Sequence, residues 1–463
     1  MPKRLKIAGG RVYDPLHEGW GEVRDLYLAG DRLVAYLPEV DEVLDAQQQA
    51  VLPGGVDLRG QVAGFGLNFL RLWGKLPSPS RLAEAYVTLG YTHVHEPFMT
   101  LATARYVHRQ LEKLPLVDTS ASLVVNLQDL DLWLKDRRRW EEVAETLRFY
   151  LEWTRALNLR VMEPWVRHRQ EVYAHRNISL EETLELLTWL AGYLQHSIVL
   201  EASPEILRAS LPKPQAFHLA ALGAALTEDG LLDTALAQLE GGTTGDLGLV
   251  WPQEAPAGDG IPRQVDLGLS APLKLWGEPS RDRASRALRL ALAYKGQAAA
   301  FSGAGAFLAP VQRYAEMWGF LGNRKVRGEF WGENSGLREW TFREWVWATR
   351  TLPARLLGLT DRGHLGPGAL ADVALFDLPP GDPETRWPDF VGKCRTLLKG
   401  GVVVVDNFQV VREEVPKATW YRATGVEATP LAAELCQFLS LRPENFWLSG
   451  ELEGIIWRRV QDR

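Results

Sequence analysis

The stretch VLPGGVDLRGQVAGFGLNFLR, residues 51–71, decides the fold that we predict for this chain. An apolar pair, a Pro-Gly-Gly turn and a second apolar segment from Val56 to Val62 indicate passage from a small β domain into the first strand of a barrel. Arg59 and Gln61 alternate along that strand, so their side chains lie on the same side of it. Because a guanidinium cannot bind a metal ion and a carboxamide binds one poorly, neither position supplies a good metal ligand.

Strand-like apolar runs alternate with amphipathic helical runs from Gly54 onward. The expected strands fall near residues 56–63, 91–97, 122–126, 159–163, 197–202, 214–220, 246–251 and 297–302. Helix starts are marked by Ser80, by Ser179 with Glu182, and by Thr341 with Glu344. This alternation predicts the α/β class, with a (β/α)8 TIM-like barrel of parallel strands covered by helices.

The remaining segments form a second predicted unit. Short strands separated by turns occupy residues 1–53, and two strand pairs near the C-terminus are expected to pair with them. We therefore expect a small β-sandwich domain from residues 1–53 with 359–425, the barrel over residues 54–358, and a partly helical tail over residues 426–463. The glycine- and proline-rich stretch from 241 to 281 is typical of a functional lid or a partner-binding loop.

Composition excludes several classes of protein. The 463 residues are 46% hydrophobic and 24% charged, as in a globular protein with an ample core. The net charge of -6 argues against a nucleic-acid partner. Cys394 and Cys436 are the only cysteines, which suits a reducing cytoplasm. No apolar run approaches the length of about 18 residues that a membrane span needs, so we expect a cytoplasmic protein with no membrane partner.

Several stretches resemble the amidohydrolase superfamily. They are LPGGVD at 52–57, LGYTHVHEPFM at 89–99, RALNLRVMEP at 155–164, LQHSIVLEAS at 194–203, QRYAEM at 312–317 and TLPARLLGLTDRGHLGPGALADVALFDL at 351–378. Asn68, Arg71 and the LQHSI stretch make the chain similar to one branch of that superfamily. This branch contains the A subunit of formylmethanofuran dehydrogenase and its counterpart in the bacterial formyltransferase/hydrolase complex.

The resemblance implies hydrolysis of a formyl amide at two zinc-type ions, which polarise the carbonyl and activate a bridging water. The family's ligand positions fall here on Arg59, Gln61, Arg160, Val199 and Glu201, with Ala221 beside His218 and a last position near Ala304. Because these residues are not the family's donors, we expect no metal and no other cofactor. We expect instead an ion network in which Glu201 pairs with Arg59 or Arg160.

Other residues keep alternative sites open. His93 and His95 alternate on the second strand beside Glu96 and could share one metal, although buried strand histidines also serve as hydrogen-bonded core residues. Glu163, His95 and Glu201 are candidate catalytic residues. Asn68 and Arg71 occupy positions where the family's loop approaches substrate, so they are candidate substrate-binding residues. His196 and His364 match family positions that are not ligands, and we expect both to be structural.

Three functions follow from these observations. The first is a non-catalytic A subunit of a formylmethanofuran dehydrogenase-like or formyltransferase/hydrolase-like complex, with the other subunits of that complex as partners. The second is an active formyl-amide hydrolase with a rewired metal-free or mononuclear site. The third is a small-ligand-binding subunit in which Arg59, Arg71 and Arg160 bind an anion. The 18 tryptophans suit packing in a core and at subunit interfaces.

Overall fold

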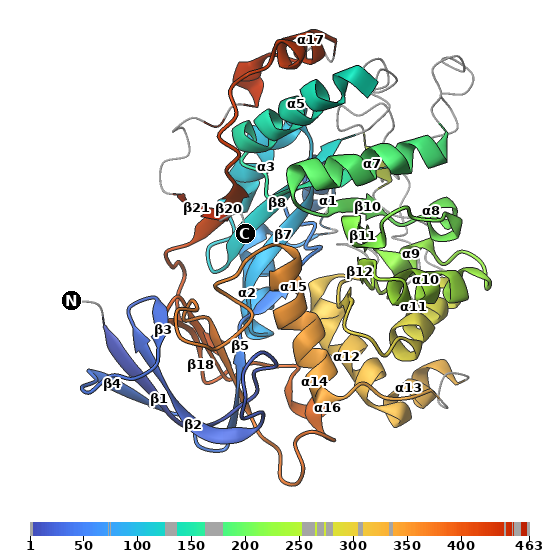
Figure 1. Cartoon of the computed structure of the whole chain (residues 1–463). Helices are drawn as coiled ribbons and strands as arrows, with labels where there is room; N and C mark the ends of the chain where they lie inside the picture. Colours follow the sequence, from blue (N-terminus) through green and yellow to red (C-terminus); the bar gives the residue numbers. More distant parts are fainter. Residues whose placement is uncertain are drawn as a thin grey trace.

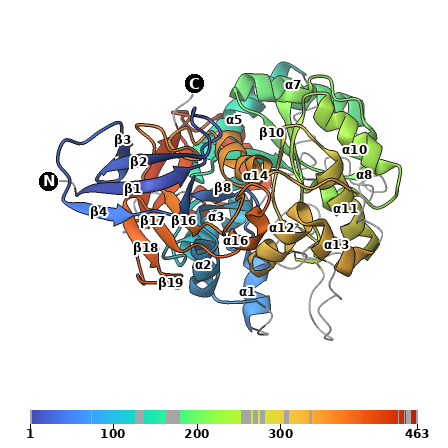
Figure 2. The same cartoon turned by 90° about the horizontal axis from the view of Figure 1, so that it is seen from below.

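Two β-sheets organise the chain, a helix-covered barrel and a smaller β unit beside it (Figure 1). Viewed from below, the small unit lies to one side of the barrel (Figure 2). The computed structural model describes residues 3–72, 74, 76–125, 137–162, 179–251, 264–265, 273–274, 281–303, 309–332, 337–438, 441–446, 448 and 455–460.

The barrel strands are parallel and follow one another in chain order. They are β6 (Gly55–Asp57), β7 (Tyr91–Met99), β8 (Asp118–Val125), β9 (Asn158–Val161), β10 (Ile198–Glu201), β11 (Phe217–Ala220), β12 (Thr244–Asp246) and β15 (Ala299–Ala300). The predicted α/β class and TIM-like barrel are thereby confirmed. The strands are nearly all buried on both faces, which explains why their sequences are apolar runs rather than strict alternations.

A helical segment covers the seam between the first and last strands. In the described part of the chain, β15 forms no ladder with β6. The segment comprises α14 (Phe342–Val346), the π-helical turn η8 (Trp347–Thr351) and α15 (Leu352–Leu356). The Phe301 backbone N–H donates to the Ala348 carbonyl at 2.8 Å. A π-helical turn changes the pattern of hydrogen bonds within a helix. Here the Ala348 carbonyl in that turn accepts from Phe301, which follows β15, and this bond ties the helical segment to the last barrel strand.

Of the three helix starts predicted from the sequence, two are confirmed at the predicted residue. Ser179 and Thr341 form capping boxes with Glu182 and Glu344. The third helix begins two residues earlier than predicted, because Ser78 rather than Ser80 caps it and proline occupies its first position. No helix in the described segments is both long and apolar enough to span a membrane. The larger helices are α1 (Phe65–Leu72), α2 (Pro79–Thr88), α3 (Ala104–Leu111), α5 (Trp140–Trp153), α7 (Leu180–Leu194), α10 (Leu231–Glu240), α11 (Arg281–Ala293), α12 (Tyr314–Gly322) and α13 (Arg324–Trp331).

Shorter elements complete the barrel unit. They are the helices α8 (Pro204–Arg208), α9 (Leu222–Ala225) and α16 (Trp387–Phe390), and the paired strands β13 (Gln264–Val265) and β14 (Leu273–Lys274). The last two lie within the 241–281 stretch for which we predicted a lid or a partner-binding loop, and most of that stretch after Trp251 lies outside the described residues.

The small unit is one nine-stranded sheet built from both ends of the chain. Its N-terminal strands are β1 (Arg4–Val12), β2 (Glu22–Ala29), β3 (Arg32–Val34), β4 (Glu42–Asp45) and β5 (Gln49–Pro53), and its C-terminal strands are β16 (Val373–Asp377), β17 (Thr396–Lys399), β18 (Val402–Asp406) and β19 (Gln409–Val410). The predicted return of the C-terminal strands is confirmed by the antiparallel pairing of β5 with β16. Both sets contribute to one apolar core, in which Ile7, Leu28, Val51, Val373 and Leu398 are buried.

The C-terminal segment differs from the prediction. Strand β20 (Ala418–Arg422) falls within the range assigned to the small unit, yet it pairs in parallel with β8 of the barrel and with β21 (Ile456–Val460). The reason is that β8 begins four residues before the position where β9 joins it, which leaves its first residues open to another strand. Helix α17 (Pro430–Phe438) then packs on α5 (Figure 1), where the Tyr150 hydroxyl donates to the Ala432 carbonyl at 3.0 Å.

Candidate functional site

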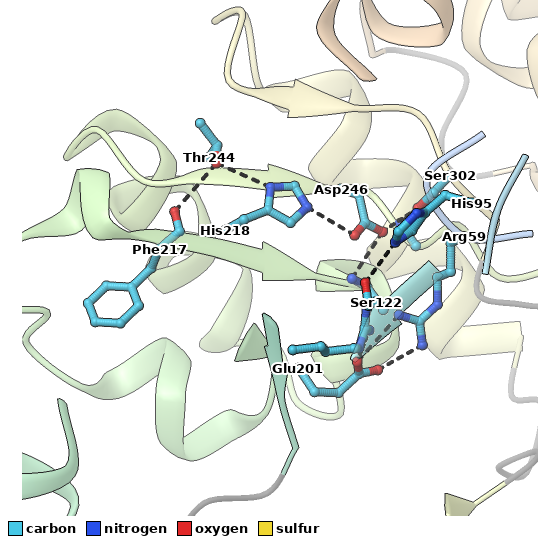
Figure 3. Close-up of polar contacts among 12 residues, drawn as sticks. Arg59, His95, Ser122, Glu201, Phe217, His218, Thr244, Asp246 and Ser302 are labelled. Atoms are coloured by element: carbon cyan, nitrogen blue, oxygen red, sulfur yellow. Dashed lines mark hydrogen bonds and ion pairs between the residues drawn. The ribbon is translucent and has the colours of Figure 1, made fainter. Parts of the chain in front are cut away.

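Two arginines and one glutamate form an ion network at the carboxyl ends of the barrel strands. Figure 3 shows Arg59 and Glu201 of this network. Arg59 follows β6, Arg160 lies on β9, and Glu201 ends β10. One Arg59 Nη donates to Glu201 Oε1 at 2.7 Å, and Arg160 donates to Glu201 Oε2. Neighbouring parallel strands bring their ends to one edge, which explains why residues 142 positions apart meet here.

The network is removed from solvent and has an aromatic wall. Arg59 and Arg160 are 5% and 3% exposed, whereas Glu201 is 21% exposed. The Phe98 ring lies against both guanidinium groups, with centroid distances of 5.3 and 4.8 Å. Burial alone would raise the pKa of the Glu201 carboxyl, but the charges and hydrogen bonds of the two arginines together lower it. Glu201 therefore stays ionised and fully engaged by cations.

A second polar group lies beside this network and contains His218, Asp246 and Ser302 (Figure 3). His218 Nε2 lies 3.4 Å from Asp246 Oδ2, and the Ser302 hydroxyl donates to Asp246 Oδ1. Burial would raise the pKa of Asp246, but the hydrogen bond from His218 and the charge of Arg59 hold it at about 2. Because the carboxylate separates the serine from the histidine, the group lacks the serine-to-histidine hydrogen bond that activates a nucleophile.

Backbone geometry fixes the position of Asp246. The Ala221 N–H donates to Asp246 Oδ1 at 3.0 Å, and Ala221 adopts a left-handed conformation with φ of 57°. A Cβ at Gly248 would lie 2.4 Å from the Ala221 Cα, so only glycine allows the two chain segments to approach this closely. The Asp246 carboxylate is thus held by the backbone of Ala221, whose left-handed conformation is strained for a residue other than glycine.

A directed chain of hydrogen bonds crosses the barrel interior through Arg362, His93, Ser120, His95, Ser122 and Asn158. Arg362 can only donate, so His93 Nδ1 accepts from it at 3.2 Å and His93 Nε2 donates to Ser120. Ser120 then donates to His95 Nδ1, and His95 Nε2 donates to Ser122. Burial and the charge of Arg160 lower the pKa of His95 to about 3, so this ring is neutral. Every ring nitrogen of the His93 and His95 pair is engaged, which leaves no lone pair for a metal.

The two candidate substrate-binding residues hold a loop. One Arg71 Nη donates to the Val62 carbonyl at 2.6 Å and the other donates to Asn68 Oδ1 at 2.8 Å, while Asn68 donates to the Tyr106 hydroxyl. On the opposite side, Glu96 Oε2 accepts the backbone N–H groups of Val62 and Ala63 at 2.8 and 2.7 Å. Arg71 is therefore engaged by the segment that follows the first strand rather than directed at open space.

The described residues around Glu201 offer no set of donors that suits a zinc-type ion. No group of three or more His, Cys, Asp and Glu side chains in the described parts of the chain is arranged to hold a metal. The only carboxylate at the centre of the network, Glu201, has both oxygens occupied by guanidinium groups. Two fixed cations would repel a divalent ion at that position. The arrangement therefore suits an internal ion network rather than a metal centre.

Several of the predicted site positions stand apart from the network. Val199 is buried on β10, and Gln61 adopts a left-handed conformation with φ of 45° beyond β6. Val199 and His218 line a cavity of about 40 Å³ inside the barrel together with His95, Arg160 and His196. His364 lies instead at the small unit, where its Nε2 bonds the Thr360 carbonyl. Glu163 and Ala304 lie outside the described residues.

Sequence reasoning missed three residues of the site. Asp246 was placed at the start of a strand over 246–251, whereas it ends the observed strand β12 and so reaches the carboxyl edge. Ser302 carries no motif, because a serine after an apolar strand occurs throughout globular proteins. Phe98 lies on β7 within the stretch LGYTHVHEPFM, but an apolar residue on a buried strand gives no signal of its own for contact with an arginine. A search for polar residues two positions after each strand could have found Ser302, which lies in that position after β15.

Sequence comparisons identify relatives of this chain. A model of the amidohydrolase family matches residues 263–405. The A subunit of the formyltransferase/hydrolase complex Fhc of Methylorubrum extorquens is 25% identical over 504 residues, which cover 88% of this chain and 89% of that protein. Protein FwdA of Methanocaldococcus jannaschii is 29% identical over 135 residues, which cover 25% of this chain and 24% of that protein.

Solved structures share the architecture. A chain of the crystal structure of the formyltransferase/hydrolase complex FhcABCD from Methylorubrum extorquens, determined with methylofuran, has a TM-score of 0.82 at 20% identity and covers 99% of this chain and 100% of that chain. Triazine hydrolase from Arthobacter aurescens has a TM-score of 0.54 at 13% identity and covers 94% of this chain and 99% of that chain.

The barrel, its flanking β unit and these matches define the chain as a protein of the amidohydrolase fold. Within that class, the long alignment at 25% identity shows that the chain is a homologue of the A subunit of the formyltransferase/hydrolase complex. The predicted resemblance is thereby confirmed.

Proposed function

We propose that this protein is the A subunit of a formyltransferase/hydrolase-like complex of one-carbon metabolism and acts there as a structural subunit without metal-dependent hydrolysis of its own. The observation that carries this proposal is the pairing of Glu201 with both Arg59 and Arg160. These residues occupy positions that the resemblance aligns with metal ligands.

The chemistry of the network supports a non-catalytic role. Hydrolysis of a formyl amide requires a polarised carbonyl, an activated water and a group that accepts its proton. An ionised carboxylate between two guanidinium groups is a poor base, because the cations stabilise its charged form. His95, the other described catalytic candidate, is a poor base at neutral pH because its pKa is about 3.

The remaining role is structural, with the other subunits of such a complex as partners. The homologue from Methylorubrum extorquens is a subunit of the complex Fhc. Neither a nucleic acid nor a membrane is part of this proposal.

Purification from the native host tests the partner half of the proposal. An affinity-tagged chain should bring the other subunits of a formyltransferase/hydrolase-like complex with it, as identified by mass spectrometry and by co-elution in size-exclusion chromatography. A chain that elutes alone from gently prepared extracts would contradict this half.

Metal analysis and a formate-release assay test the catalytic half. After incubation with zinc and desalting, the isolated chain should retain no stoichiometric zinc and should release no formate from an N-formyl substrate. Stoichiometric zinc that is lost in His95→Ala but kept in the surface control His17→Ala would show that the His93 and His95 pair holds a metal. Formate release that disappears in Glu201→Gln or Glu163→Gln would support the active-hydrolase alternative instead.

A further inference from the structure

A pocket of about 320 Å³ lies outside the barrel sheet, between the end of α11 and the start of α14. It shares no residue with the network of Arg59, Arg160 and Glu201. Its floor is apolar and buried, and it is formed by Leu247, Ala291, Ala299 and Ala348. Its volume falls within the range of pockets that hold small organic molecules, about 300–1,000 Å³.

The walls of the pocket are aromatic and are fixed in place. The wall formed by the segment around α14 contains Trp340 and Trp347, and the wall formed by the segment after α11 contains Tyr294. Trp340 Nε1 donates to the Ala291 carbonyl at 2.8 Å, and Trp347 Nε1 donates to the Gln297 carbonyl at 2.9 Å. These bonds join the two walls, so the indole rings are held in position without a ligand.

Arg338 adds two further bonds between the walls. Its Nε donates to the Leu292 carbonyl at 2.8 Å, and one Nη donates to the Tyr294 carbonyl at 2.6 Å. Its charge is balanced by Glu344 at 2.9 Å. A Cβ at Gly296 would lie 2.3 Å from the Tyr294 hydroxyl oxygen, so glycine is needed for the tyrosine to fold over this loop. The pocket is therefore preformed, which lowers the entropic cost of binding.

The rim carries two cations without a carboxylate partner. Within the described residues, Lys295 makes no hydrogen bond or ion pair, and Arg343 contacts only the Pro15 carbonyl and the Trp20 ring. With Arg338 and Glu344 neutralising each other, the lining has a net charge of two positive units from Lys295 and Arg343. Unpaired cations beside aromatic walls favour an anionic group attached to a planar ring.

We propose that this pocket binds a small planar aromatic or heteroaromatic molecule that carries a carboxylate, sulfonate or phosphate group. The ring lies between Tyr294 and the two tryptophans, and the anionic group faces Lys295 and Arg343. This site is independent of the proposed function, because it depends on neither the former metal positions nor a partner subunit.

Two fluorescent dyes with the same ring system test the proposal on the full chain. Anilinonaphthalene sulfonate carries the anion, and N-phenylnaphthylamine lacks it. The sulfonate dye should bind at one saturable site. The double variant Lys295→Met/Arg343→Met should weaken its binding about tenfold, as expected for the loss of charge-assisted contacts, and leave binding of the neutral dye unchanged.

Two further variants distinguish the pocket from general surface binding. Gln297→Trp places a large ring at the rim, where the native side chain is exposed, and should block both dyes. Lys325→Met on α13 removes an exposed lysine outside the pocket and should leave both dyes unaffected. Equal binding of both dyes to the native chain, or sulfonate binding that Lys295→Met/Arg343→Met and Gln297→Trp leave unchanged, would overturn the proposal.

Discussion

Two groups of four charged side chains differ in the parts of the chain that they connect. The mouth quartet lies at the carboxyl ends of the barrel strands and consists of Arg59, Arg160, Glu201 and Asp246. The floor quartet lies where the barrel meets the small unit and consists of Asp118, Arg362, Asp372 and Lys399. Each contains two basic and two acidic side chains, so charge balance alone does not distinguish them.

Their connections do distinguish them. Asp118 accepts from Arg362 at 2.8 Å, from Lys399 at 2.7 Å and from the backbone of Ala418 at 2.7 Å. One carboxylate thus ties a barrel strand to the small unit and to the C-terminal strand β20. Burial would raise the pKa of Asp118, but the two cations lower it well below its ordinary value. The mouth quartet instead joins residues of the barrel alone.

The comparison shows that similar sets of charges can either connect separate parts of the fold or stay within the barrel alone. Breaking the floor quartet should therefore lower the free energy of unfolding of the whole chain. Breaking the network of Arg59, Arg160 and Glu201 should have a smaller effect, and replacing these three residues together by apolar residues should have the smallest.

The largest effect is expected for Arg362→Met. It leaves Asp118 and Asp372 buried with only Lys399 to balance them, so the free energy of unfolding should fall by about 3–5 kcal/mol. Urea unfolding followed by circular dichroism measures this value. The control Arg395→Met breaks an ion pair with Asp377 in which the side chains are 37% and 44% exposed, and it should change stability by less than about 1 kcal/mol. A similar decrease in unfolding free energy for both variants would mean that the floor quartet does not stabilise the fold.

A smaller loss is expected for Glu201→Gln. Removing this charge leaves the two guanidinium groups of Arg59 and Arg160 close together without a carboxylate between them. The free energy of unfolding should fall by about 3 kcal/mol, at the lower end of the range for buried ion pairs, because the Glu201 carboxylate is partly exposed. The matched control Glu142→Gln alters a partly exposed glutamate on α5 that pairs with Arg139, which precedes this helix. Differential scanning calorimetry compares the two, and a melting temperature for Glu201→Gln equal to that of the control would refute the ion network.

Stability should also depend on pH through Glu96, which supports the loop that carries Gln61. Burial raises the pKa of Glu96 from 4.5 to about 7. The folded state therefore binds more protons than the unfolded state between these values, and stability decreases as pH rises through this range. The slope of unfolding free energy against pH should be shallower in Glu96→Gln. An unchanged slope would show that Glu96 titrates normally.

The smallest effect is expected when the mouth network is replaced as a whole. The triple variant Arg59→Met/Arg160→Met/Glu201→Leu removes the three charges that pair with one another, and packed apolar side chains of similar size can match such a network. Its unfolding free energy should lie within about 1–2 kcal/mol of the native value, well above that of Glu201→Gln. A triple variant less stable than Glu201→Gln would show that the charges themselves stabilise the mouth.

Local sequence was sufficient to predict each strand that supplies the network. The junction at 54–62 located the first strand, although that strand ends at Asp57, so Arg59 and Gln61 follow it rather than alternate along it. RALNLRVMEP and LQHSIVLEAS located Arg160 and Glu201 on neighbouring strands. Asp246 was missed because the strand predicted over 246–251 lies at 244–246, so the residue expected at its first position is its last. The hydrogen-bond chain through His93 and His95 was also beyond prediction, since its direction depends on Arg362, which is 269 residues away from His93.

By itself, the sequence determined the alternation of strands and helices, the return of the C-terminal strands to the small unit, and the presence of guanidinium groups where metal ligands are expected. These properties depend on residue type and short-range periodicity. Only the tertiary structure decided that Glu201 pairs with both arginines, that β20 joins the barrel, and that Asp118 connects three parts of the chain. Such contacts depend on how segments far apart in the sequence pack against one another, and no local sequence pattern specifies which of these segments meet.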